Sequence, residues 1–460
     1  MLAIPAALAA PLDPTTASST STSSSETAVT PDRAALPRTS RLAVAVRFVW
    51  VCAVFAWFGL RRVVGSVDGP TALRLAFERL GPIYTKLGQL VASGEALFPA
   101  RYSEAFRTLL DRVPPFPFAD VVATLEGDLG VPVTERFAEI DPKPLAAASI
   151  AQVHTARLDD GRAVVVKVQR PGIPALAAAD VAILRLFARI LSRVSKLARG
   201  ANVVAVVEDF ATTLADELDF RREARHMRDF NDVMRLMGND RVAAPTVIDR
   251  LTRARVLTME RFSGWRIDDV VAVRKSPYDP EQRLLEGIRA WFQTLIVRGS
   301  FHGDVHAGNF MLLEDGRVGF LDFGIVGSFR DTDRQGVLQY VLGFQQRDMA
   351  RVADAMIAME ALPPGAKIDR DGLVDELTRT FASVIEGDDA LHLKDLAGSM
   401  LRAARRHGLR MPRDLVLVTK QLVYLDRYSR AYGGDKMNVL TDQRLSAMIM
   451  EDAMRAASLA

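Results

Sequence analysis

The sequence has almost no cysteine, and this absence narrows the kinds of protein it can encode. Its 460 residues include a single cysteine, Cys52, which excludes an internal disulfide framework and a cysteine-rich zinc site. The formal net charge is only +3, so composition gives no case for nucleic acid as the main ligand. Hydrophobic residues make up 49% of the chain, which excludes global disorder. At about 150 residues per domain, the length predicts two or three domains, or one two-lobed unit with extensions.

Long apolar runs are also scarce, and one segment is a membrane candidate. In LAVAVRFVWVCAVFAWFGL, residues 42–60, the run is interrupted by Arg47, and the part after it is shorter than the roughly 20 residues of a spanning helix. We expect a buried or interfacial helix over 41–65 that can contact a membrane; the alternative is an integral span, which flanking arginines favour. The predicted location is the cytoplasmic face of a membrane, peripheral or anchored through 42–62, or the cytoplasm if the segment is only core.

The N-terminal region lacks a periodic apolar pattern. It is rich in Ser, Thr and Pro and cannot bury enough surface to offset chain entropy, so we expect residues 1–40 to be a disordered tail. Its apolar beginning, MLAIPAALAA, has no basic residue of the kind that opens a secretory signal. A start codon assigned too early explains this segment equally well.

The strongest chemical pattern is the string FHGDVHAGNFMLLEDGRVGFLDFG at 301–324, in which Asp304 precedes Asn309, a hairpin and Asp322. Phosphoryl transfer from a nucleotide needs a carboxylate near the attacking oxygen, and an amide oxygen and a second carboxylate on Mg²⁺. The order H-x-D-x-x-x-x-N and then D-F-G is the catalytic half of the protein-kinase signature, with Gly303 where protein kinases have Arg. We predict that Asp304 is catalytic and that Asn309 and Asp322 bind the metal.

Two histidines in the same string allow a different interpretation. His302 and His306 are four residues apart and could ligate a metal ion if they lay on a helix. Gly303 and Gly308 favour a loop instead, and no third ligand is evident. A structural role in supporting the loop is therefore the preferred interpretation.

A site of this kind also needs a phosphate-pairing lysine on a strand. The run RAVVVKVQR follows a hairpin signal at 159–161 and places Lys167 among β-branched residues, so we predict that Lys167 is a catalytic and nucleotide-binding residue. The segment Leu257–Phe262 stands where a connector between two lobes must lie. Its backbone groups would read the adenine edge, and Glu260 and Phe262 are counted among the cofactor-binding residues.

The carboxylate partner of the lysine should come from the helix or helix pair expected over 203–237. Asp219 and Glu223 are four residues apart and share a helix face, whereas Glu217 lies about 200° from Asp219 unless a helix bends or starts there. We assign Glu223 to the lysine and Asp219 to the nucleotide side. The alternative is a solvated face with ion pairs within the helix, such as Asp219–Arg222.

A glycine-rich phosphate loop is missing. Where it should precede the lysine strand, the chain has Ala146, Ala147, Ala148 and Ser149. Alanine carries a Cβ and resists the positive φ angles that glycine loops adopt, so we expect a stiffer loop that grips phosphates differently.

These residues resemble the UbiB family, also called the AarF or ADCK group, of atypical protein-kinase-like proteins. The resemblance covers about residues 70–440. It rests on Lys86-Leu87-Gly88-Gln89 for the family's K-x-G-Q, Ala146–Ser149 with Gln152-Val153-His154 for its alanine-rich loop, Lys167, Glu217-Leu218-Asp219 for its E-x-D, Glu223, His302-Gly303-Asp304 with Asn309, and Asp322-Phe323-Gly324. One departure is Ala151, where the family usually has Gly.

The resemblance implies an α+β, protein-kinase-like bilobal fold with an N-terminal helical K-x-G-Q extension and a mainly helical C-lobe. It implies that Lys86, Gly88 and Gln89, with Glu217 and Asp219, occlude the place where a protein substrate would bind. The expected organisation is a tail over 1–40, the apolar helix over 41–65, the extension over 66–130, the N-lobe over 131–260, the C-lobe over 261–440 and a C-terminal tail over 441–460.

The same resemblance implies ATP or ADP and Mg²⁺ as cofactors, an ATPase-like activity, and a link to ubiquinone, prenylquinone or related lipid metabolism. The implied partners are a membrane lipid or quinone precursor and quinone-biosynthesis proteins. One alternative is a small-molecule phosphotransferase whose acceptor pocket would use acidic residues of the C-terminal helices, namely Asp375, Glu376, Asp388 and Asp389. Another is a non-catalytic, nucleotide-gated scaffold that binds a lipid or protein.

Overall fold

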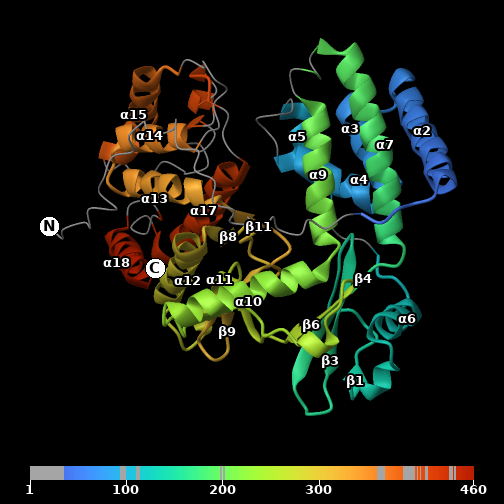
Figure 1. Ribbon diagram of the computed structural model, residues 1–460, viewed down its shortest axis with the longest axis horizontal. Coiled ribbons are helices and arrows are strands. Elements are labelled where there is room, and N and C mark those ends of the chain that lie inside the picture. The colour runs from blue at the N-terminus through green and yellow to red at the C-terminus, as the bar shows by residue number, and fades with distance from the viewer. Residues whose placement is uncertain are drawn as a thin grey trace, which may run out of the picture. The chain divides into compact units, whose positions relative to one another are not determined.

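The computed structural model divides into two compact units, and Figure 1 labels their elements. Within the described part of the chain, the first unit comprises residues 36–225 and 246–261, and the second comprises 226–245 and 262–459. Most of the predicted tail over 1–40 lies outside the described residues. The structure describes residues 36–93, 100–109, 114–196, 199, 202–359, 368–386, 399–400, 402–404, 406–409, 413–434, 439 and 442–459.

The first unit contains a helical bundle. Side-chain oxygens cap the N-termini of its first two helices: Ser40 accepts from the backbone N–H of Ala43 at 3.1 Å, and Asp68 accepts from that of Thr71 at 2.7 Å. The bundle helices are α2 (Arg41–Val63), α3 (Gly69–Leu80), α4 (Pro82–Ser93), α5 (Ala100–Phe106), α7 (Ile173–Val194) and α9 (Val203–Glu217).

The bundle has its own apolar core, built largely of aromatic rings. Phe77 meets Tyr84 and Phe106 edge-to-face, with ring centroids 5.5 and 5.1 Å apart. Val51 and Val54 of α2 are buried in the same core. The apolar segment found in the sequence therefore folds as one helix with one face in the protein.

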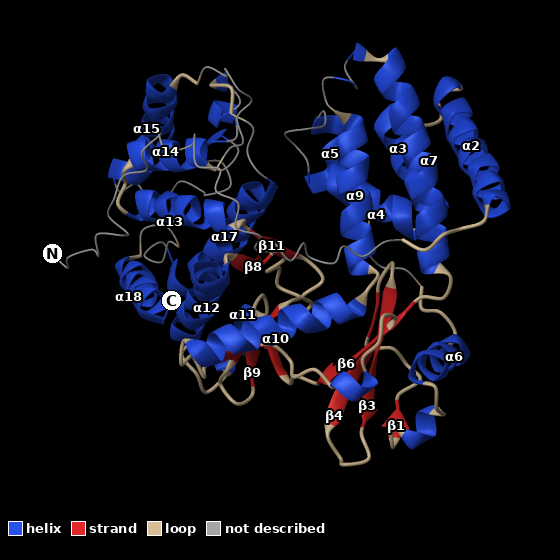
Figure 2. Cartoon of the chain, viewed as in Figure 1, coloured by secondary structure: helices blue, strands red, loops and turns tan. Residues whose placement is uncertain are grey.

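The sheet of the first unit carries the lysine strand. Its strands run in the order β1 (Glu139–Ile140), β3 (Ala151–Arg157), β4 (Ala163–Gln169) and β6 (Val256–Glu260), with β2 (Ala146–Ala147) also paired to β3, all antiparallel. Figure 2 shows these strands in red. The buried core of this sheet is shared with α6 (Phe118–Leu129). Two 3₁₀ turns complete it, Val133–Glu135 and Asp249–Leu251.

The alternation of β4 explains the position of Lys167. Val164, Val166 and Val168 are in the core shared with α6, and in a strand successive side chains point to opposite faces. Lys167 therefore points to the opposite face, in register with Val153 of β3. The predicted strand and its hairpin are both present.

The second unit contains a small sheet surrounded by helices. The sheet has the order β5 (Val242–Ala243), β10 (Val318–Phe320), β9 (Phe310–Leu313) and β7 (Gly264–Arg266), and β8 (Ser300–His302) pairs separately with β11 (Val326–Ser328). The chain enters this unit within α10 (Phe220–Leu236). Its other helices are α11 (Val270–Lys275), α12 (Pro280–Arg298), α13 (Asp331–Gln345), α14 (Met349–Ala358), α15 (Arg370–Glu386), α17 (Arg413–Gly433) and α18 (Gln443–Leu459).

The end of the chain differs from the tail expected over 441–460. Residues Gln443–Leu459 form α18, which packs against α12. Arg289 of α12 forms a bidentate ion pair with the buried carboxylate of Asp452, with both contacts at 2.7 Å, and Gln293 donates to the same carboxylate at 3.1 Å. A lone amphipathic stretch does not reveal such partners, which lie about 160 residues earlier in the sequence.

Candidate functional site

Lys167 and Glu223 form a close ion pair inside the first unit. The Lys167 Nζ lies 2.9 Å from both carboxylate oxygens of Glu223, whose side chain is only 5% exposed. The ammonium group also lies over the ring of Phe220, 5.4 Å from its centroid. The structure thus brings together the two residues that the sequence assigned to each other.

A break between two helices places this glutamate. α9 ends at Glu217 and α10 begins at Phe220, so the segment 203–237 is a helix pair. The turn is fixed by two hydrogen bonds to the sheet region: Gln169 donates to the carbonyl of Leu218, and the N–H of Phe220 donates to the carbonyl of Ala254, both at 2.9 Å. In one continuous helix Glu217 and Asp219 would lie on opposite faces, and the break between the two helices removes this constraint.

The E-x-D residues point to separate partners. Glu217 pairs with Lys86 at 2.6 Å, and Asp219 pairs with Arg221 at 2.8 Å. Burial alone would raise the pKa of Asp219, but hydrogen bonds from Arg221 outweigh it and lower the pKa. Arg222 reaches Asp216 at 3.3 Å, so the pairs formed differ from those expected for a simple solvated face.

The K-x-G-Q residues lie on α4 within the bundle. Lys86 and Gln89 are partly exposed, whereas Gly88 is buried. A Cβ on Gly88 would come within 2.7 Å of side-chain carbons of Phe106 and Leu109, so glycine is needed for close packing here. Gly88 thus has a packing role within the bundle, and Lys86 carries the polar contact to the E-x-D segment.

The alanine-rich loop is a tight turn between two strands. Ala146 and Ala147 pair with β3 as β2, and the N–H of Ala148 donates to the carbonyl of Ala151 at 2.8 Å. Ser149 is buried within the turn. No residue of this fully described turn has a positive φ, so alanine fits the loop without strain.

The buried side chain of Gln152, which follows the alanine-rich loop, supports this region through hydrogen bonds. Gln152 accepts from the N–H of Phe116 at 2.8 Å and donates to its carbonyl at 3.2 Å. It also donates to Nε2 of His154, whose Nδ1 donates to the carbonyl of Asp141 at 2.8 Å. This arrangement requires a neutral His154 ring and fixes its tautomer.

Arg170 is a further residue of this region that sequence reasoning missed. Its guanidinium donates to the carbonyl of Pro114 at 3.0 Å and lies over the ring of Phe116, 5.1 Å from the centroid. Its backbone N–H donates to the carbonyl of Ile150 in the alanine turn. Burial lowers the pKa of Arg170. In the sequence, only its position three residues after Lys167 could have pointed to Arg170 as a residue of this region.

The predicted connector coincides with the boundary between the units, which falls between Arg261 and Phe262. Within the first unit, Glu260 ends β6 and its carboxylate accepts from the N–H of Thr246 at 3.1 Å. Within the second unit, the Phe262 ring closely covers Gly319. Both side chains therefore have structural contacts, and the role of Glu260 and Phe262 in binding a nucleotide stays a prediction.

His302 holds together the two acidic motifs of the second unit. Its Nε2 donates to the carbonyl of Leu321 at 2.8 Å, and its Nδ1 accepts from the N–H of Asp304 at 3.1 Å. Burial lowers the pKa of His302, which keeps the ring neutral. Because both ring nitrogens are used, the preferred structural interpretation of this histidine is confirmed over metal ligation.

The predicted metal-binding residues are held rigidly in this unit. Asn309 is buried, and its amide nitrogen donates to the carbonyl of Asp304 at 3.0 Å, which leaves the amide oxygen on the opposite side. Asp322 has a φ of 52°, unusual for a residue other than glycine, and accepts from the N–H of Gly324 at 3.2 Å. The Phe323 ring is buried, 4.7 Å from the ring of His302.

Gln421 of α17 is a second support that sequence reasoning missed. The fully buried amide accepts from the N–H of Val305 at 2.9 Å and donates to the carbonyl of Gly303 at 2.7 Å. A Cβ on Gly303 would come within 3.0 Å of Leu417 and 2.8 Å of Ile325. This packing explains why glycine replaces the arginine of protein kinases, and no local pattern could have identified a partner 116 residues away.

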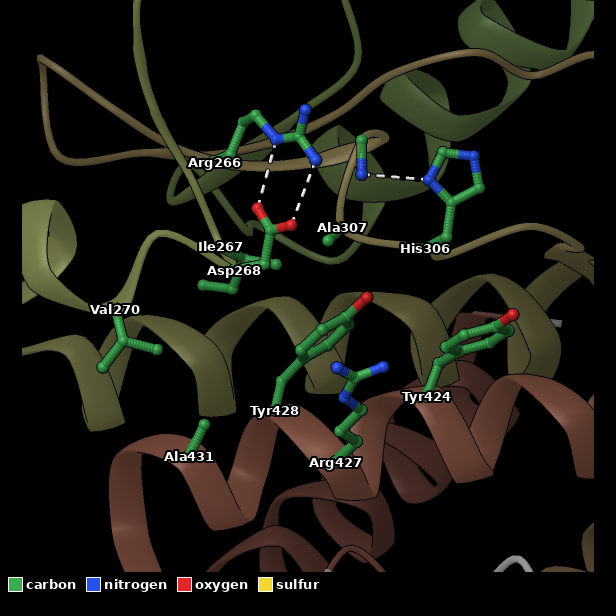
Figure 3. A pocket seen from close by; sticks show the side chains of 11 residues that line it. Arg266, Ile267, Asp268, Val270, His306, Ala307, Tyr424, Arg427, Tyr428 and Ala431 are labelled. Atoms are coloured by element: carbon green, nitrogen blue, oxygen red, sulfur yellow. Dashed lines mark hydrogen bonds and ion pairs between the residues drawn. The ribbon is translucent and has the colours of Figure 1, made fainter. Parts of the chain in front are cut away.

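A pocket of about 330 Å³ lies beside this loop, entirely within the second unit. Figure 3 shows Tyr424, Arg427 and Tyr428 extending from α17, opposite His306. His306 Nε2 is 3.5 Å from the carboxylate of Asp304, so the pocket wall contacts the predicted catalytic residue. Burial raises the pKa of Tyr428, which keeps its phenol protonated as a donor.

The donor set of the second unit suits Mg²⁺. Among the described residues, no three or more His, Cys, Asp or Glu side chains cluster as a metal site. Asn309 and Asp322 would supply two oxygen ligands, and Mg²⁺ commonly takes one or two protein ligands and completes its shell with water and phosphate oxygens.

The acidic residues expected to line an acceptor pocket are only partly described. Glu376 pairs with His407 at 2.9 Å, and Asp375 lies on the same helix, α15. Asp388 and Asp389 lie outside the described residues.

Comparisons with known proteins agree with these features. A family model described as the ABC1 atypical kinase-like domain matches residues 108–356. An uncharacterised chloroplastic aarF domain-containing protein kinase of Arabidopsis thaliana is 34% identical over 403 residues, which cover 82% of this chain and 74% of the relative. A probable protein kinase UbiB of Azotobacter vinelandii is 35% identical over 383 residues, 81% of this chain and 70% of the relative.

A solved structure is similar as well. A Mycobacterium tuberculosis protein in complex with erythromycin has a TM-score of 0.50 and 27% sequence identity, and the match covers 80% of this chain and 87% of that one. Together with the family model, this likeness confirms the predicted α+β, protein-kinase-like fold. The matched range includes Lys167, Glu223 and the whole 301–324 string, so the described geometry belongs to the part that is shared.

Proposed function

The chain belongs to the ABC1 atypical kinase-like family, and from this premise we propose that it is an ATPase or kinase dependent on Mg²⁺ that supports ubiquinone, prenylquinone or related lipid metabolism. Lys167, fixed by Glu223, would bind the phosphates of ATP or ADP beside the turn at Ala146–Ser149. Asn309 and Asp322 would hold Mg²⁺, which neutralises phosphate charge when bound. Asp304 would act on the attacking oxygen.

The observation that supports this proposal best is the Lys167–Glu223 pair. An ion pair that is largely removed from water contributes little net stability, because desolvation offsets the attraction between the charges. Two apolar residues would fill the same space at lower cost. A lysine at this position, on the strand face opposite to the core shared with α6, is therefore better explained by a phosphate ligand than by folding.

Nucleotide binding tests the assignment of the metal-binding residues. Asp322→Asn should abolish the thermal stabilisation that Mg-ATP or Mg-ADP gives the wild-type protein, because a carboxylate ligand of Mg²⁺ is lost. Asp315→Asn is the matched control: Asp315 lies in the turn of the same string and pairs with Arg317 at 2.7 Å. An unchanged Mg-nucleotide shift in Asp322→Asn would contradict the site.

Turnover tests the activity. We expect the purified protein to hydrolyse ATP, and liposomes or a phenolic quinone precursor to stimulate it, since the proposed role lies in lipid metabolism. Asp304→Asn should lose turnover while keeping nucleotide affinity. Tight nucleotide binding without any hydrolysis would favour the alternative of a nucleotide-gated scaffold for a lipid or partner protein, such as a quinone-biosynthesis enzyme.

The pocket beside His306 supports a second candidate function, a small-molecule phosphotransferase. Its volume of about 330 Å³ lies at the lower end of the range for small-ligand sites. An acceptor hydroxyl there would give its proton to Asp304 as its oxygen bonds to the γ-phosphorus of ATP and the bond to ADP breaks. Tyr428→Leu should then raise KM for the acceptor without changing the affinity for nucleotide. If an acceptor screen shows phosphate transfer to water and to none of the small molecules, this function is excluded.

A further inference from the structure

His226, which belongs to none of the motifs described above, contacts the turn that carries Asp322. Its Nδ1 lies 3.1 Å from the carbonyl oxygen of Phe323. Because a carbonyl oxygen can only accept, Nδ1 carries the proton and donates the hydrogen bond. The ring is partly buried on α10, and the contact lies entirely within the second unit. A polar side chain is thus directed at the backbone next to a predicted metal-binding residue.

A second histidine makes the same kind of bond on the other side of Asp322 in the chain. His302 Nε2 donates to the carbonyl of Leu321, the residue before Asp322. His226 Nδ1 donates to the carbonyl of Phe323, the residue after it. Each bond fixes the direction of one peptide group, and together they restrict the backbone torsions between the two carbonyls. The conformation of Asp322 is therefore set from two distant parts of the chain.

Asp322 needs such restraint, because its backbone is in an unfavourable conformation. Its φ of 52° lies in the left-handed region, which residues other than glycine seldom adopt. Its carboxylate accepts from the N–H of Gly324 at 3.2 Å, so the side chain is turned towards its own backbone. A conformation of this kind persists only where the surrounding contacts impose it. Loss of one of the two histidine bonds should therefore let the turn relax and the carboxylate change direction.

The apolar contacts of α10 reach the same motif but cannot replace this hydrogen bond. Phe230 lies four residues after His226 and thus on the same face of the helix. Its ring centroid is 5.3 Å from that of Phe323 and 5.1 Å from that of Phe320. These contacts hold the ring of Phe323 in place. They do not fix the direction of its carbonyl, which depends on the hydrogen bond.

A contribution to folding alone explains His226 less well. The ring is partly exposed, so water could bond to the Phe323 carbonyl if the fold needed only a partner for it. A water molecule does not hold a carbonyl in one direction as a side chain fixed on a helix does. Contacts one step removed from a metal are known to orient the groups that bind it.

We propose that His226 is a positioning residue for the metal site, and that it acts through the backbone of Phe323 to hold the Asp322 carboxylate in the orientation that binds Mg²⁺. This role rests on the proposed function, in which Asp322 binds Mg²⁺ together with ATP or ADP. His226 itself would touch neither the metal nor the nucleotide. Its loss should therefore weaken the binding of Mg²⁺ more than it disturbs the fold.

Two variants of His226 separate hydrogen bonding from packing. His226→Leu fills similar space without a donor, whereas His226→Asn keeps an amide nitrogen near the position of Nδ1. With saturating ADP, we would measure the Mg²⁺ concentration that gives half of the maximal thermal stabilisation, relative to each variant in EDTA. We expect His226→Leu to raise this concentration by about tenfold or more, and His226→Asn to stay close to the wild-type protein. His407→Leu is the matched control, since this partly buried histidine of the same unit pairs with Glu376 at 2.9 Å.

Hydrogen exchange tests the same contact without metal or nucleotide. The backbone N–H of Gly324 bonds to the Asp322 carboxylate, so its exchange rate reports on the turn. Mass spectrometry of a peptide that covers residues 321–326 should show faster exchange in His226→Leu than in the wild-type protein, His226→Asn or His407→Leu. If His226→Leu does not fold, His226→Gln takes its place, because its amide nitrogen lies one bond further along the side chain than Nδ1.

The outcomes separate this role of His226 from the proposed function. If the wild-type protein responds to Mg-ADP and His226→Leu needs the same Mg²⁺ concentration, His226 has no positioning role and the proposed function stands. If His226→Asn loses as much as His226→Leu, the hydrogen bond does not position the carboxylate, and the proposal is wrong. If the wild-type protein gives no response to Mg²⁺, the proposed function fails and the role of His226 fails with it, even if the turn exchanges faster in His226→Leu.

Discussion

The two units hold their predicted site residues by different means. In the first unit, full charges fix one another, as Lys167 and Glu223 do at 2.9 Å. In the second unit, the loop that carries Asp304 is fixed by neutral groups, the ring of His302 and the amide of Gln421.

This difference suits what each unit would present to a nucleotide. A neutral support adds no positive charge beside Asp304 and Asp322, so these carboxylates keep their attraction for a cation. A carboxylate beside Lys167 instead attracts the ammonium group and fixes its direction. Substitutions in the two units should therefore destabilise the protein for different reasons. In the first unit the loss of a charge should matter, and in the second the loss of a hydrogen-bonding group should matter.

The largest expected effect is on the charged side of this comparison. Lys167→Met removes the ammonium group that lies against the buried Glu223 carboxylate, and we expect the free energy of unfolding to fall by about 3 kcal/mol. Denaturant melts monitored by circular dichroism would measure the change. Lys143→Met, at an exposed lysine of the same unit, should have no measurable effect.

The double variant Lys167→Met/Glu223→Met separates charge from packing. Because it removes both charges, it should regain most of the stability lost in Lys167→Met while still binding no nucleotide. If the double variant were as unstable as the single one, Lys167 would stabilise the fold by packing and not by its charge. The contrast between charged support in the first unit and neutral support in the second would then be wrong.

The next largest effect is expected on the neutral side. Gln421→Leu keeps the side-chain volume but leaves the N–H of Val305 and the carbonyl of Gly303 without their partner, so unfolding should become easier by about 2 kcal/mol. Gln443→Leu, at an exposed glutamine of α18, serves as the control in the same melts. A loss in Gln421→Leu no larger than in the control would mean that the loop is held without this amide.

Sequence reasoning succeeded where chemistry is local and failed where contacts are distant. The strand at Lys167 was predicted from its β-branched run and the preceding hairpin signal, and the possibility of a helix break near Glu217 followed from helix geometry. The Arg47–Asp180 pair, by contrast, joins residues 133 positions apart. A single sequence gives the type of each residue but not which distant partner the fold supplies, so the supporting contacts of α2 could not be derived.

The same limit applies to the contacts of the loop that carries Asp304. The order of Asp304, Asn309 and Asp322 follows one continuous string and could be predicted. The roles of Gln421 and of the packing around Gly303 could not, because they depend on α17. The helix over Gln443–Leu459 was missed for the same reason, since its stabilising ion pair lies on α12.

A pH-dependent effect of intermediate size is expected at His302. Burial lowers its pKa below the ordinary value of 6.5, so below about pH 6.5 the unfolded chain binds a proton that the folded chain does not. The stability associated with this ring is thus retained above that pH and lost as the pH falls, by up to about 1.4 kcal/mol per pH unit.

Melts between neutral and mildly acidic pH would measure this slope. His302→Gln should show a shallower dependence than the wild-type protein, whatever its absolute stability, because the titrating ring is gone. His306→Gln, which changes a partly exposed ring of the same loop, is the control. Identical slopes in the wild-type protein and His302→Gln would show that the ring can accept the proton in the folded state.

The smallest effect sharpens the comparison, because it concerns a charge pair of the first unit that is open to water. Asp219 pairs with Arg221, whose side chain is 60% exposed, so Asp219→Asn should change the free energy of unfolding by no more than about 0.5 kcal/mol. Its effect on binding is the informative measurement. If Asp219 lies on the nucleotide side, as its spacing from Glu223 led us to assign it, Mg-ATP or Mg-ADP affinity measured by calorimetry should change although stability does not. If neither quantity changes, Asp219 serves only to start α10, and the functional charge of this unit reduces to the buried Lys167–Glu223 pair and the Lys86–Glu217 contact.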